Sequence, residues 1–332
     1  DGRPDVFIGA RNVPKNYGVS PRSYLLENQG SGRWKDVTPD SLKHPGMITD
    51  ATWTDYDNDG DDDLIVVGEW MPVIFFKNDS GKLHYDFTVK KSSGWWSTIA
   101  PKDLDGDGDI DFVLGNWGNN SRFQASEKRP LSMYVGDFNR DKKQEFLITS
   151  YLPAEGKAYP FHPYDDMIKQ FPFLKEKIPD HHAYAKMTYK KLFSKDQRKR
   201  AKRKQVQTLS SSLLINENGT YELKKLPLEA QISPVHAIVA EDFNGDSRTD
   251  LLLLGNETGL KPNIGTLSGN WGVLLLNDRN LDYKFEPYSQ TNTIIKGEVR
   301  DALTIRSADA RYIIIGRNNE KLLMYKTSKT LQ

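Results

Sequence analysis

Apolar residues occur along this chain in short runs, and the runs come in pairs on either side of an acidic segment. The stretch ITDATWT (48–54) alternates apolar and polar residues, and LIVVGEW (64–70) follows after nine mainly acidic and polar residues. The same order recurs in WSTIAPK (96–102) and FVLGNWG (112–118). Alternation with a period of two and runs this short are typical of β-strands. The pattern therefore predicts a repeated unit of strand, acidic loop and strand in an all-β fold.

The unit recurs at intervals that suit a β-propeller. Acidic segments begin at Asp55, Asp103, Asp137 and Asp242, so successive starts are 48, 34 and 105 residues apart. A propeller blade is a four-stranded antiparallel sheet of about 40–50 residues, and the longest interval has room for a blade plus an insertion of about 50 residues. We therefore expect a single domain over 1–332, a β-propeller of five or six blades, with seven as the upper count, and a helical insertion.

Both ends of the chain carry incomplete copies of the unit. Asp1–Asp5 and the VFIGAR that follows match only the second half of an acidic segment and its strand. We therefore expect the N-terminal blade to be truncated and the chain to be the C-terminal part of a longer protein. Residues 299–326 keep the strand rhythm but lack the acidic segment, as terminal repeats often do.

The acidic segments have the spacing of a cation site. Oxygen atoms at positions 1, 3, 5, 7 and 9 of a tight loop converge on one point, which suits Ca²⁺ with its about 6–8 oxygen ligands better than Mg²⁺. We expect two to four structural Ca²⁺ ions. The predicted ligands, with position 7 acting through its backbone carbonyl, are Asp55, Asp57, Asp59, Asp61 and Asp63; Asp103, Asp105, Asp107, Asp109 and Asp111; Asp137, Asn139, Asp141, Lys143 and Glu145; and Asp242, Asn244, Asp246, Arg248 and Asp250.

Two other interpretations of these acidic segments are a solvated turn and an EF-hand. A solvated acidic turn needs no ion, and it fits the segment at 137 best, where Lys142 replaces the turn glycine and Glu145 the last aspartate. An EF-hand requires a bidentate glutamate at position 12 and a following helix. Position 12 is Val66, Leu114, Ile148 or Leu253 in the four copies, and each lies in a strand-like run. The EF-hand is therefore excluded in every copy.

The pattern D-x-[DN]-x-D-G-x-x-D, followed by an apolar strand and glycine, resembles the FG-GAP/VCBS repeat, the calcium-loop propeller blade of integrin α-chains. The copies at 55–63, 103–111, 137–145 and 242–250 carry the resemblance. The GNWG at 115–118 and the final IIIGRNNEKLLMY are also similar to C-terminal regions of large exported bacterial repeat proteins. The resemblance implies calcium at the loops, export, and a role in recognition or adhesion.

Residues 155–208 interrupt the strand rhythm and form the predicted helical, basic insertion. YDDMIKQFPFLKEKI (164–178) has helical spacing, and 186–204 carries ten Lys or Arg against one acid, Asp196. A solvated helix is one interpretation of this basic run, and contact with a polyanion is the other. No interleaved aromatic ladder accompanies the run, so it does not favour nucleic acid. Exposed tryptophans such as Trp117 could stack on sugars, whereas buried ones would be core residues.

Composition narrows the functions that remain. The chain has 46 basic and 45 acidic residues and no cysteine, which excludes a uniformly basic nucleic-acid binder, a thiol nucleophile and a disulfide scaffold. No apolar run approaches the about 20 residues of a membrane-spanning helix. The six histidines form no HExxH motif, and no GxSxG or phosphate-binding loop is present.

These observations favour a non-catalytic, calcium-stabilised recognition or adhesion module that binds a protein or a carbohydrate. The expected location is extracellular, at the cell surface or in the periplasm, where weak structural calcium sites are filled. The alternative is a calcium-dependent, lyase-like enzyme acting on polysaccharides. A basic side chain in a cleft beside a calcium ion would distinguish the enzyme from the binding module.

Overall fold

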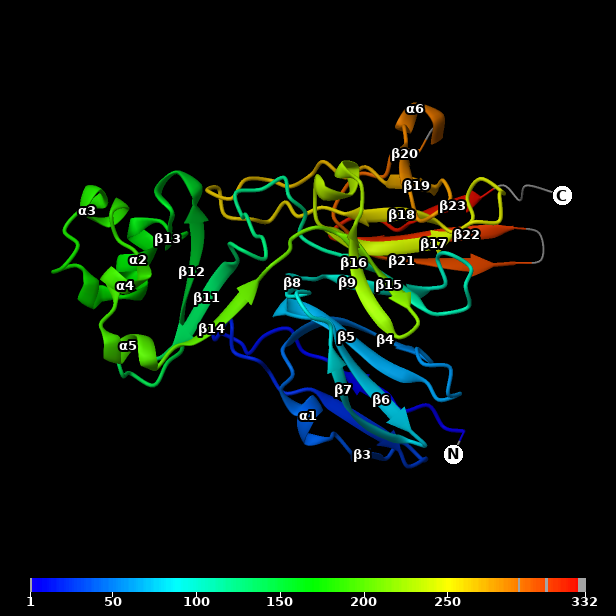
Figure 1. Cartoon of the computed structure of the whole chain (residues 1–332), viewed down its shortest axis with the longest axis horizontal. Coiled ribbons are helices and arrows are strands. Elements are labelled where there is room, and N and C mark those ends of the chain that lie inside the picture. Colours follow the sequence, from blue (N-terminus) through cyan, green and yellow to red (C-terminus); the bar gives the residue numbers. More distant parts are fainter. Residues whose placement is uncertain (1, 292, 308–309, 328–332) are drawn as a thin grey trace.

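Antiparallel sheets build nearly the whole chain in the computed structural model, which describes residues 2–291, 293–307 and 310–327 (Figure 1). Asp1, the first residue of the incomplete N-terminal copy, lies outside the described residues. The all-β, propeller-like fold class is confirmed, because the described residues form several four-stranded antiparallel sheets. No helix of the described residues is long and apolar enough to cross a membrane.

The first two sheets follow the chain without interruption. The first has three strands and the second has four, with a further short strand paired to its second member. Their elements are β1 (Val6–Ile8), β2 (Tyr24–Asn28) and β3 (Trp34–Asp36); α1 (Asp40–Lys43); and β4 (Met47–Thr54), β5 (Asp63–Met71), β6 (Ile74–Asp79), β7 (Lys82–Thr88) and β8 (Gly94–Trp95).

The third sheet is built from two segments that are far apart in the sequence. Its strands are β9 (Thr98–Lys102), β10 (Asp111–Gly115), β15 (Ser212–Glu217) and β16 (Thr220–Lys225). Strand β10 pairs with β15 in the register Phe112 to Leu214. Residues 116–211 are therefore inserted between the second and third strands of one blade.

The inserted segment forms a four-stranded sheet and a group of short helices, which Figure 1 shows together at one end of the molecule. The predicted insertion, 155–208, lies within this longer segment. The sheet order is β13–β12–β11–β14. The elements are β11 (Leu131–Gly136), β12 (Glu145–Leu152), η1 (Pro153–Glu155), β13 (Lys157–Pro160), α2 (Tyr164–Gln170), η2 (Pro172–Leu174), α3 (His181–Ala185), α4 (Tyr189–Leu192), α5 (Lys195–Lys199) and β14 (Lys202–Val206).

Local sequence explains why the inserted helices are short. Pro172 cannot continue the hydrogen bonding of α2, which ends at Gln170. Ser194 begins α5 with a capping box, in which its side chain accepts from the Gln197 N–H and Gln197 bonds back to Ser194. Such short helices are not stable alone, so they depend on a shared apolar cluster. That cluster includes Phe138, Met167, Phe171, Leu174, Ile178, Leu192 and Phe193.

The last two sheets complete the order along the chain. The elements after β16 are η3 (Leu228–Gln231), β17 (Val235–Glu241), β18 (Asp250–Gly255), β19 (Val273–Asn277), β20 (Tyr283–Glu286), α6 (Tyr288–Thr291), β21 (Val299–Arg306), β22 (Arg311–Arg317) and β23 (Leu323–Thr327). The final sheet, β21–β22–β23, has three strands among the described residues.

Neighbouring blades pack face to face, and their first strands lie next to one another. Strand β4 contacts β9, β9 contacts β17, and β17 contacts β21. Apolar side chains from adjoining blades fill the space between the sheets; Phe75 of β6, for example, packs edge-to-face on Phe112 of β10. This arrangement places equivalent ends of the blades side by side, so that corresponding loops gather at the same end of the molecule.

Candidate metal centre

All four acidic segments connect the first and second strands of a β-hairpin. The 55 loop (55–63) joins β4 to β5, the 103 loop (103–111) joins β9 to β10, the 137 loop (137–145) joins β11 to β12, and the 242 loop (242–250) joins β17 to β18. The 137 loop belongs to the inserted sheet, whereas the other three belong to blades along the chain. The structure therefore gives the four loops the same topological place.

The carboxylate at position 1 holds the loop backbone in each copy. Asp55 accepts hydrogen bonds from the backbone N–H groups of Asp59 (3.1 Å) and Gly60 (2.9 Å). Asp103, Asp137 and Asp242 each also accept two backbone bonds within their own loops. One comes from position 6 in every copy; the other comes from position 5 in the 137 loop and from position 4 in the 103 and 242 loops. The bond from the position-6 N–H to the position-1 carboxylate is thus common to all four loops, including those with substitutions at other positions.

A left-handed backbone at position 6 is also common to the four loops. Glycine provides it in Gly60 (φ 94°) and Gly108 (φ 98°). Lys142 (φ 68°) and Ser247 (φ 65°) adopt the same region in the other two loops, although a side chain makes it unfavourable. The loss of glycine in the 137 loop therefore leaves the backbone conformation intact and adds local strain.

The carboxylate at position 9 is buried and ties the loop to the blade. Asp63 accepts from the N–H of Tyr56 (3.3 Å) within the loop and from the N–H of Asn78 (2.7 Å) at the end of β6. Asp111 and Asp250 make the same pair of bonds, the second of them to Asn216 and Asn277. Glu145 accepts from the loop N–H of Phe138 (3.0 Å). Position 9 is therefore a structural acceptor as well as a predicted ligand.

Burial shifts the ionisation of these position-9 groups. Desolvation raises the pKa of Asp63 and of Asp111 to about 6, against two opposing backbone hydrogen bonds in each case. Desolvation also raises the pKa of Glu145 and of Asp250. Ionising a buried carboxylate beside other carboxylates costs free energy, and a cation between them would offset that cost.

Two of the loops bring three carboxylates together. One oxygen from each of Asp55, Asp57 and Asp63 lies within 4.8 Å of the others, and Asp103, Asp105 and Asp111 form a second such group. These are positions 1, 3 and 9 of the two loops. Oxygens at this spacing are the donor set that a hard cation such as Ca²⁺ uses.

The remaining predicted ligands lie within the same loops but make other contacts. At position 5, Asp59 and Asp107 each accept from the backbone N–H two residues later. At position 7, Arg248 donates from Nε to the Asn277 carbonyl (2.7 Å) and pairs through Nη2 with Asp246. Position 3 is an asparagine in the 137 and 242 loops. Asn139 and Asn244 each accept a hydrogen bond from a backbone N–H of their own loop.

A lysine that the sequence pattern did not single out lies at the 55 loop. Lys77, from β6, pairs with Asp57 and lies 2.9 Å from Asp59 through its Nζ atom. Those two hydrogen bonds raise the pKa of Lys77. The 103 triad has no ion pair with a lysine or arginine among the described residues. A cation entering the 103 loop therefore does not have to displace a basic side chain, unlike a cation entering the 55 loop.

The sequence pattern also did not identify the asparagines near the ends of β6, β15 and β19, the third strands of three blades. Asn78, Asn216 and Asn277 donate their backbone N–H to position 9, and the side chains of Asn78 and Asn216 accept from Gly81 and Gly219 in the following turns. The repeated asparagine in FFKND, LLINE and LLLND was a signal that could have revealed this role.

The family described as FG-GAP-like repeat matches this sequence over residues 1–66 and 55–114. Residues 1–114 are FG-GAP-like repeats. These FG-GAP-like repeats contain both carboxylate triads, at 55–63 and 103–111.

Two solved structures are similar to the chain at low identity. The V. cholerae biofilm matrix protein Bap1 is 10% identical with a TM-score of 0.31, and the match covers 94% of this chain and 66% of Bap1, just under two thirds of its length. Sqt1 from Chaetomium thermophilum is 10% identical with a TM-score of 0.28, covering 95% of this chain and 81% of Sqt1. No curated protein matches the sequence.

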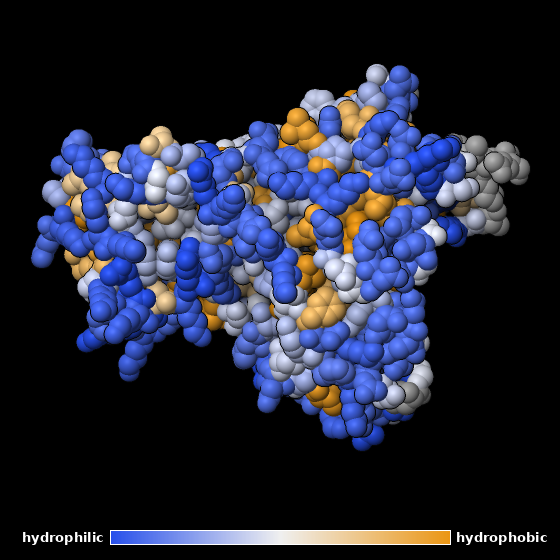
Figure 2. Space-filling view, in the orientation of Figure 1, coloured by the Kyte–Doolittle hydropathy of each residue, from blue (hydrophilic) through white to orange (hydrophobic). Residues whose placement is uncertain are grey.

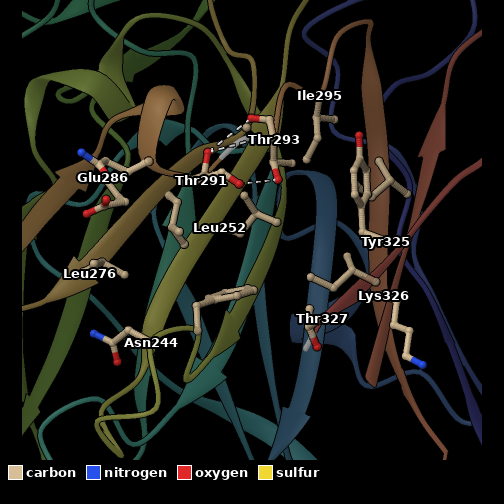
Figure 3. A pocket seen from close by; sticks show the side chains of 16 residues that line it. Asn244, Leu252, Leu276, Glu286, Thr291, Thr293, Ile295, Tyr325, Lys326 and Thr327 are labelled. Atoms are coloured by element: carbon tan, nitrogen blue, oxygen red, sulfur yellow. Dashed lines mark hydrogen bonds between the residues drawn. The ribbon is translucent and has the colours of Figure 1, made fainter. Parts of the chain in front are cut away.

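A cavity of about 540 Å³ lies away from the loop triads, between the last two sheets (Figure 3). Its lining is mainly apolar and includes Leu252, Ile295 and Tyr325, with Glu286 and Lys326 among the polar residues. In sheet β17–β20, the fourth strand carries Tyr283 and Phe285 into the core shared with the preceding blade. The final sheet has three strands among the described residues, and the cavity lies beside its outer strand β23. The cavity therefore contains none of the triad carboxylates and lies at the edge of the final sheet.

Proposed function

We propose that this chain is a calcium-stabilised extracellular recognition module that binds a protein or carbohydrate partner without catalysing a reaction. The observation that supports the proposal most directly is the pair of carboxylate triads in the 55 and 103 loops, each at the hairpin between the first two strands of a blade. FG-GAP-like repeats in the same residues agree with it.

Ion binding at these loops would stabilise the blades. Each triad includes a carboxylate hydrogen-bonded to the third strand of its blade, so that a bound ion is connected to the sheet and not only to a surface turn. A ligand at 100 times its Kd stabilises the folded state by about 2.7 kcal/mol per site, provided the unfolded chain does not bind it. Two filled sites are thus comparable with the about 5–15 kcal/mol net stability of a domain.

The experiment is a thermal unfolding series with calcium, magnesium or chelator. We expect chelator to lower the unfolding temperature, and calcium to restore it better than magnesium. Asp105→Ala should remove one ion from the stoichiometry measured by calorimetry. Asp62→Ala is the matched control, because Asp62 is exposed at position 8 of the 55 loop and lies outside its triad. Unfolding that is insensitive to chelator, with no calcium uptake, would contradict the proposal.

The proposed location and partners follow from the same sites. Structural calcium sites with Kd of about 10⁻⁴–10⁻³ M are filled outside cells, which supports an exported module. The segment 155–208 has fourteen basic and six acidic residues, so the remainder of the chain is net acidic. Figure 2 shows a largely hydrophilic surface over this part of the molecule. Lys190, Lys195, Lys199 and Lys202 are exposed there and support a contact with an anionic polymer.

A further inference from the structure

A second cavity lies where the blades meet, and we call it the axial pocket. Its volume is about 380 Å³, within the about 300–1,000 Å³ range of small-molecule sites. Five of the sheets contribute lining residues, among them Arg11 after β1, Glu69 of β5, Trp117 after β10, His236 of β17, Glu257 after β18 and Arg300 of β21. The site is therefore formed only when these blades assemble.

The axial pocket and the acidic loops lie at opposite ends of the blades. The loops follow the end of each first strand and precede the second strand. The pocket is lined instead by residues at the beginning of first strands, such as His236 and Arg300, and at or after the end of second strands, such as Glu69 and Glu257. The two kinds of site are thus separate, and a calcium ion held in a loop would not occupy the pocket.

Charged side chains in the pocket are already paired with one another. Arg11 Nε donates to Glu69 Oε1 at 2.9 Å, and Arg300 Nη1 donates to Glu257 Oε2 at 2.9 Å. Tyr17 donates to the other oxygen of Glu69 (2.6 Å). The lining thus holds two guanidiniums and two carboxylates that are paired with each other, and Arg300 Nη2 also bonds to Glu298 Oε2 (3.1 Å), which lies outside the lining.

This balance of charge argues for a neutral ligand. A charged molecule would meet attraction and repulsion of similar size, and it would lose hydration on entry. A wholly apolar molecule would cover the ionised groups without offering hydrogen bonds, which is also unfavourable. A molecule with many hydroxyl groups can donate to the carboxylate oxygens and accept from the guanidinium N–H groups at the same time.

Aromatic rings complete the chemistry of the axial pocket. Trp95 and Trp117 line it, are half-buried, and stack at a centroid distance of 4.8 Å and an angle of 17°. The buried Nε1 of Trp95 has no hydrogen-bond partner among the described residues, and Nε2 of His236 lies 3.6 Å from Glu257 Oε2. Large rings beside fixed polar groups suit a ligand with apolar C–H faces and polar edges.

The backbone holds the two carboxylates in place at some cost. Trp70, directly after Glu69, has φ 59° and is 4% exposed; Asn256, directly before Glu257, has φ 95° and is 2% exposed. Left-handed backbone is unfavourable in a residue with a side chain, and such strain is concentrated at functional sites. The Trp70 indole donates to Tyr17 Oη (3.0 Å), which links the strained turn to the Glu69 pair.

We propose that the axial pocket binds a neutral sugar residue of a carbohydrate partner. The proposal rests on the recognition function above and names the partner class that the module binds. Arg11, Glu69, Glu257 and Arg300 hydrogen-bond the hydroxyl groups, and the tryptophans contact the ring. Binding does not involve the acidic loops directly, so calcium uptake and sugar binding are measured independently.

The test uses the full chain in calcium and a panel of neutral sugars: glucose, galactose, mannose, N-acetylglucosamine and their disaccharides. Ligand-observed NMR and tryptophan emission detect complexes with a Kd of up to about 10 mM. This range includes the millimolar Kd expected for one small sugar. Glucuronate and glucosamine are the anionic and cationic probes. We expect at least one neutral sugar to bind, and glucuronate and glucosamine to bind more weakly than that sugar.

Two pocket variants and two matched variants complete the experiment. Arg11→Ala and Glu257→Gln should weaken binding of the selected sugar by roughly tenfold or more, since each removes hydrogen bonds to the ligand. Arg306→Ala and Glu241→Gln alter another Arg–Glu pair (2.8 Å) at the opposite end of β17 and β21 and should leave binding unchanged. Unfolding temperatures of all four variants show which remain folded.

Three results would overturn the sugar site. They are the failure of every neutral sugar to bind the folded, calcium-loaded chain, tighter binding of glucuronate or glucosamine than of the neutral sugars, and equal affinity in the pocket and control variants. Calcium uptake without sugar binding would overturn the sugar site and leave the calcium-stabilised module standing. Sugar binding that persists in chelator, without calcium uptake, would overturn the calcium-stabilised module and leave the sugar site standing.

Discussion

Asp111 Oδ1 accepts a hydrogen bond of 2.8 Å from the backbone N–H of Asn216, a residue that lies 105 positions later in the chain. The bond joins the last residue of the 103 loop to the third strand of the same blade. The entire inserted sheet lies between these two residues in the sequence. Its second oxygen accepts from the Leu104 N–H (3.0 Å). One buried carboxylate thus connects the loop, the second strand and the third strand.

Replacing this carboxylate should destabilise the blade. We expect Asp111→Ala to lower the free energy of unfolding by about 2–4 kcal/mol, because two buried N–H groups lose their acceptor. Urea unfolding in chelator measures the effect without a contribution from bound ions. Asp109→Ala is the control, since Asp109 is only partly buried and accepts one longer side-chain bond (3.3 Å) from Asn58. Equal losses in the two variants would show that Asp111 has no special structural role.

Lys77 should reduce the calcium affinity of the 55 loop. Its ammonium group pairs with Asp57 and Asp59, so that an entering ion must displace or repel it. We expect Lys77→Met to increase the calcium affinity of this loop several-fold, as measured by calorimetry in an Asp105→Ala background that lacks the 103 site. Lys82→Met, at an exposed position of β7, should have no effect. An unchanged or lower affinity in Lys77→Met would contradict this account.

The 137 loop should become more stable when glycine is restored at position 6. Lys142 is exposed and has φ 68°, a conformation that costs a residue with a side chain about 1 kcal/mol or more relative to glycine. We expect Lys142→Gly to raise the free energy of unfolding by about 0.5–1 kcal/mol. Lys143→Gly is the matched control, because Lys143 is exposed but is not left-handed. Thermal or urea unfolding should show no gain for that variant.

Acid should loosen the inserted sheet through His162. Burial, together with the nearby Lys261, lowers the pKa of His162 to about 4, and its Nε2 accepts from the Ile148 N–H (3.1 Å). The folded-state pKa is below the unfolded value of about 6.5, so the unfolded chain binds the proton more readily. The stability that neutral His162 contributes is therefore complete above pH 6.5 and is lost as the pH falls towards 4.

Hydrogen exchange at the Ile148 amide between pH 7 and pH 4, corrected for the intrinsic exchange rate, measures this loss. We expect His162→Gln, which keeps a side-chain acceptor but does not titrate, to flatten the dependence. His84→Gln, at an exposed position on β7, should behave as the unaltered chain does. A pH dependence that survives in His162→Gln would assign the effect to another group.

The acidic loops could be predicted from the sequence because they are local structures. Asp55 bonds to residues four and five positions later, and positions 1, 3 and 9 come together within a nine-residue hairpin. Spacing alone therefore identifies the carboxylate triads. The strands could be predicted for the same reason, since their alternation reflects burial on the two faces of one sheet.

Tertiary structure alone decided which distant segments share a blade and a site. The interval after the 137 loop predicted a blade plus an insertion, whereas β10 pairs with β15 and the whole inserted sheet lies between them in the sequence. Strand sequences of similar composition do not specify which partner they pair with, because the pairing depends on packing between sheets. The same holds for Lys77 at the 55 loop and for Arg11 and Arg300 in the axial pocket, since each reaches its site from a separate strand or blade.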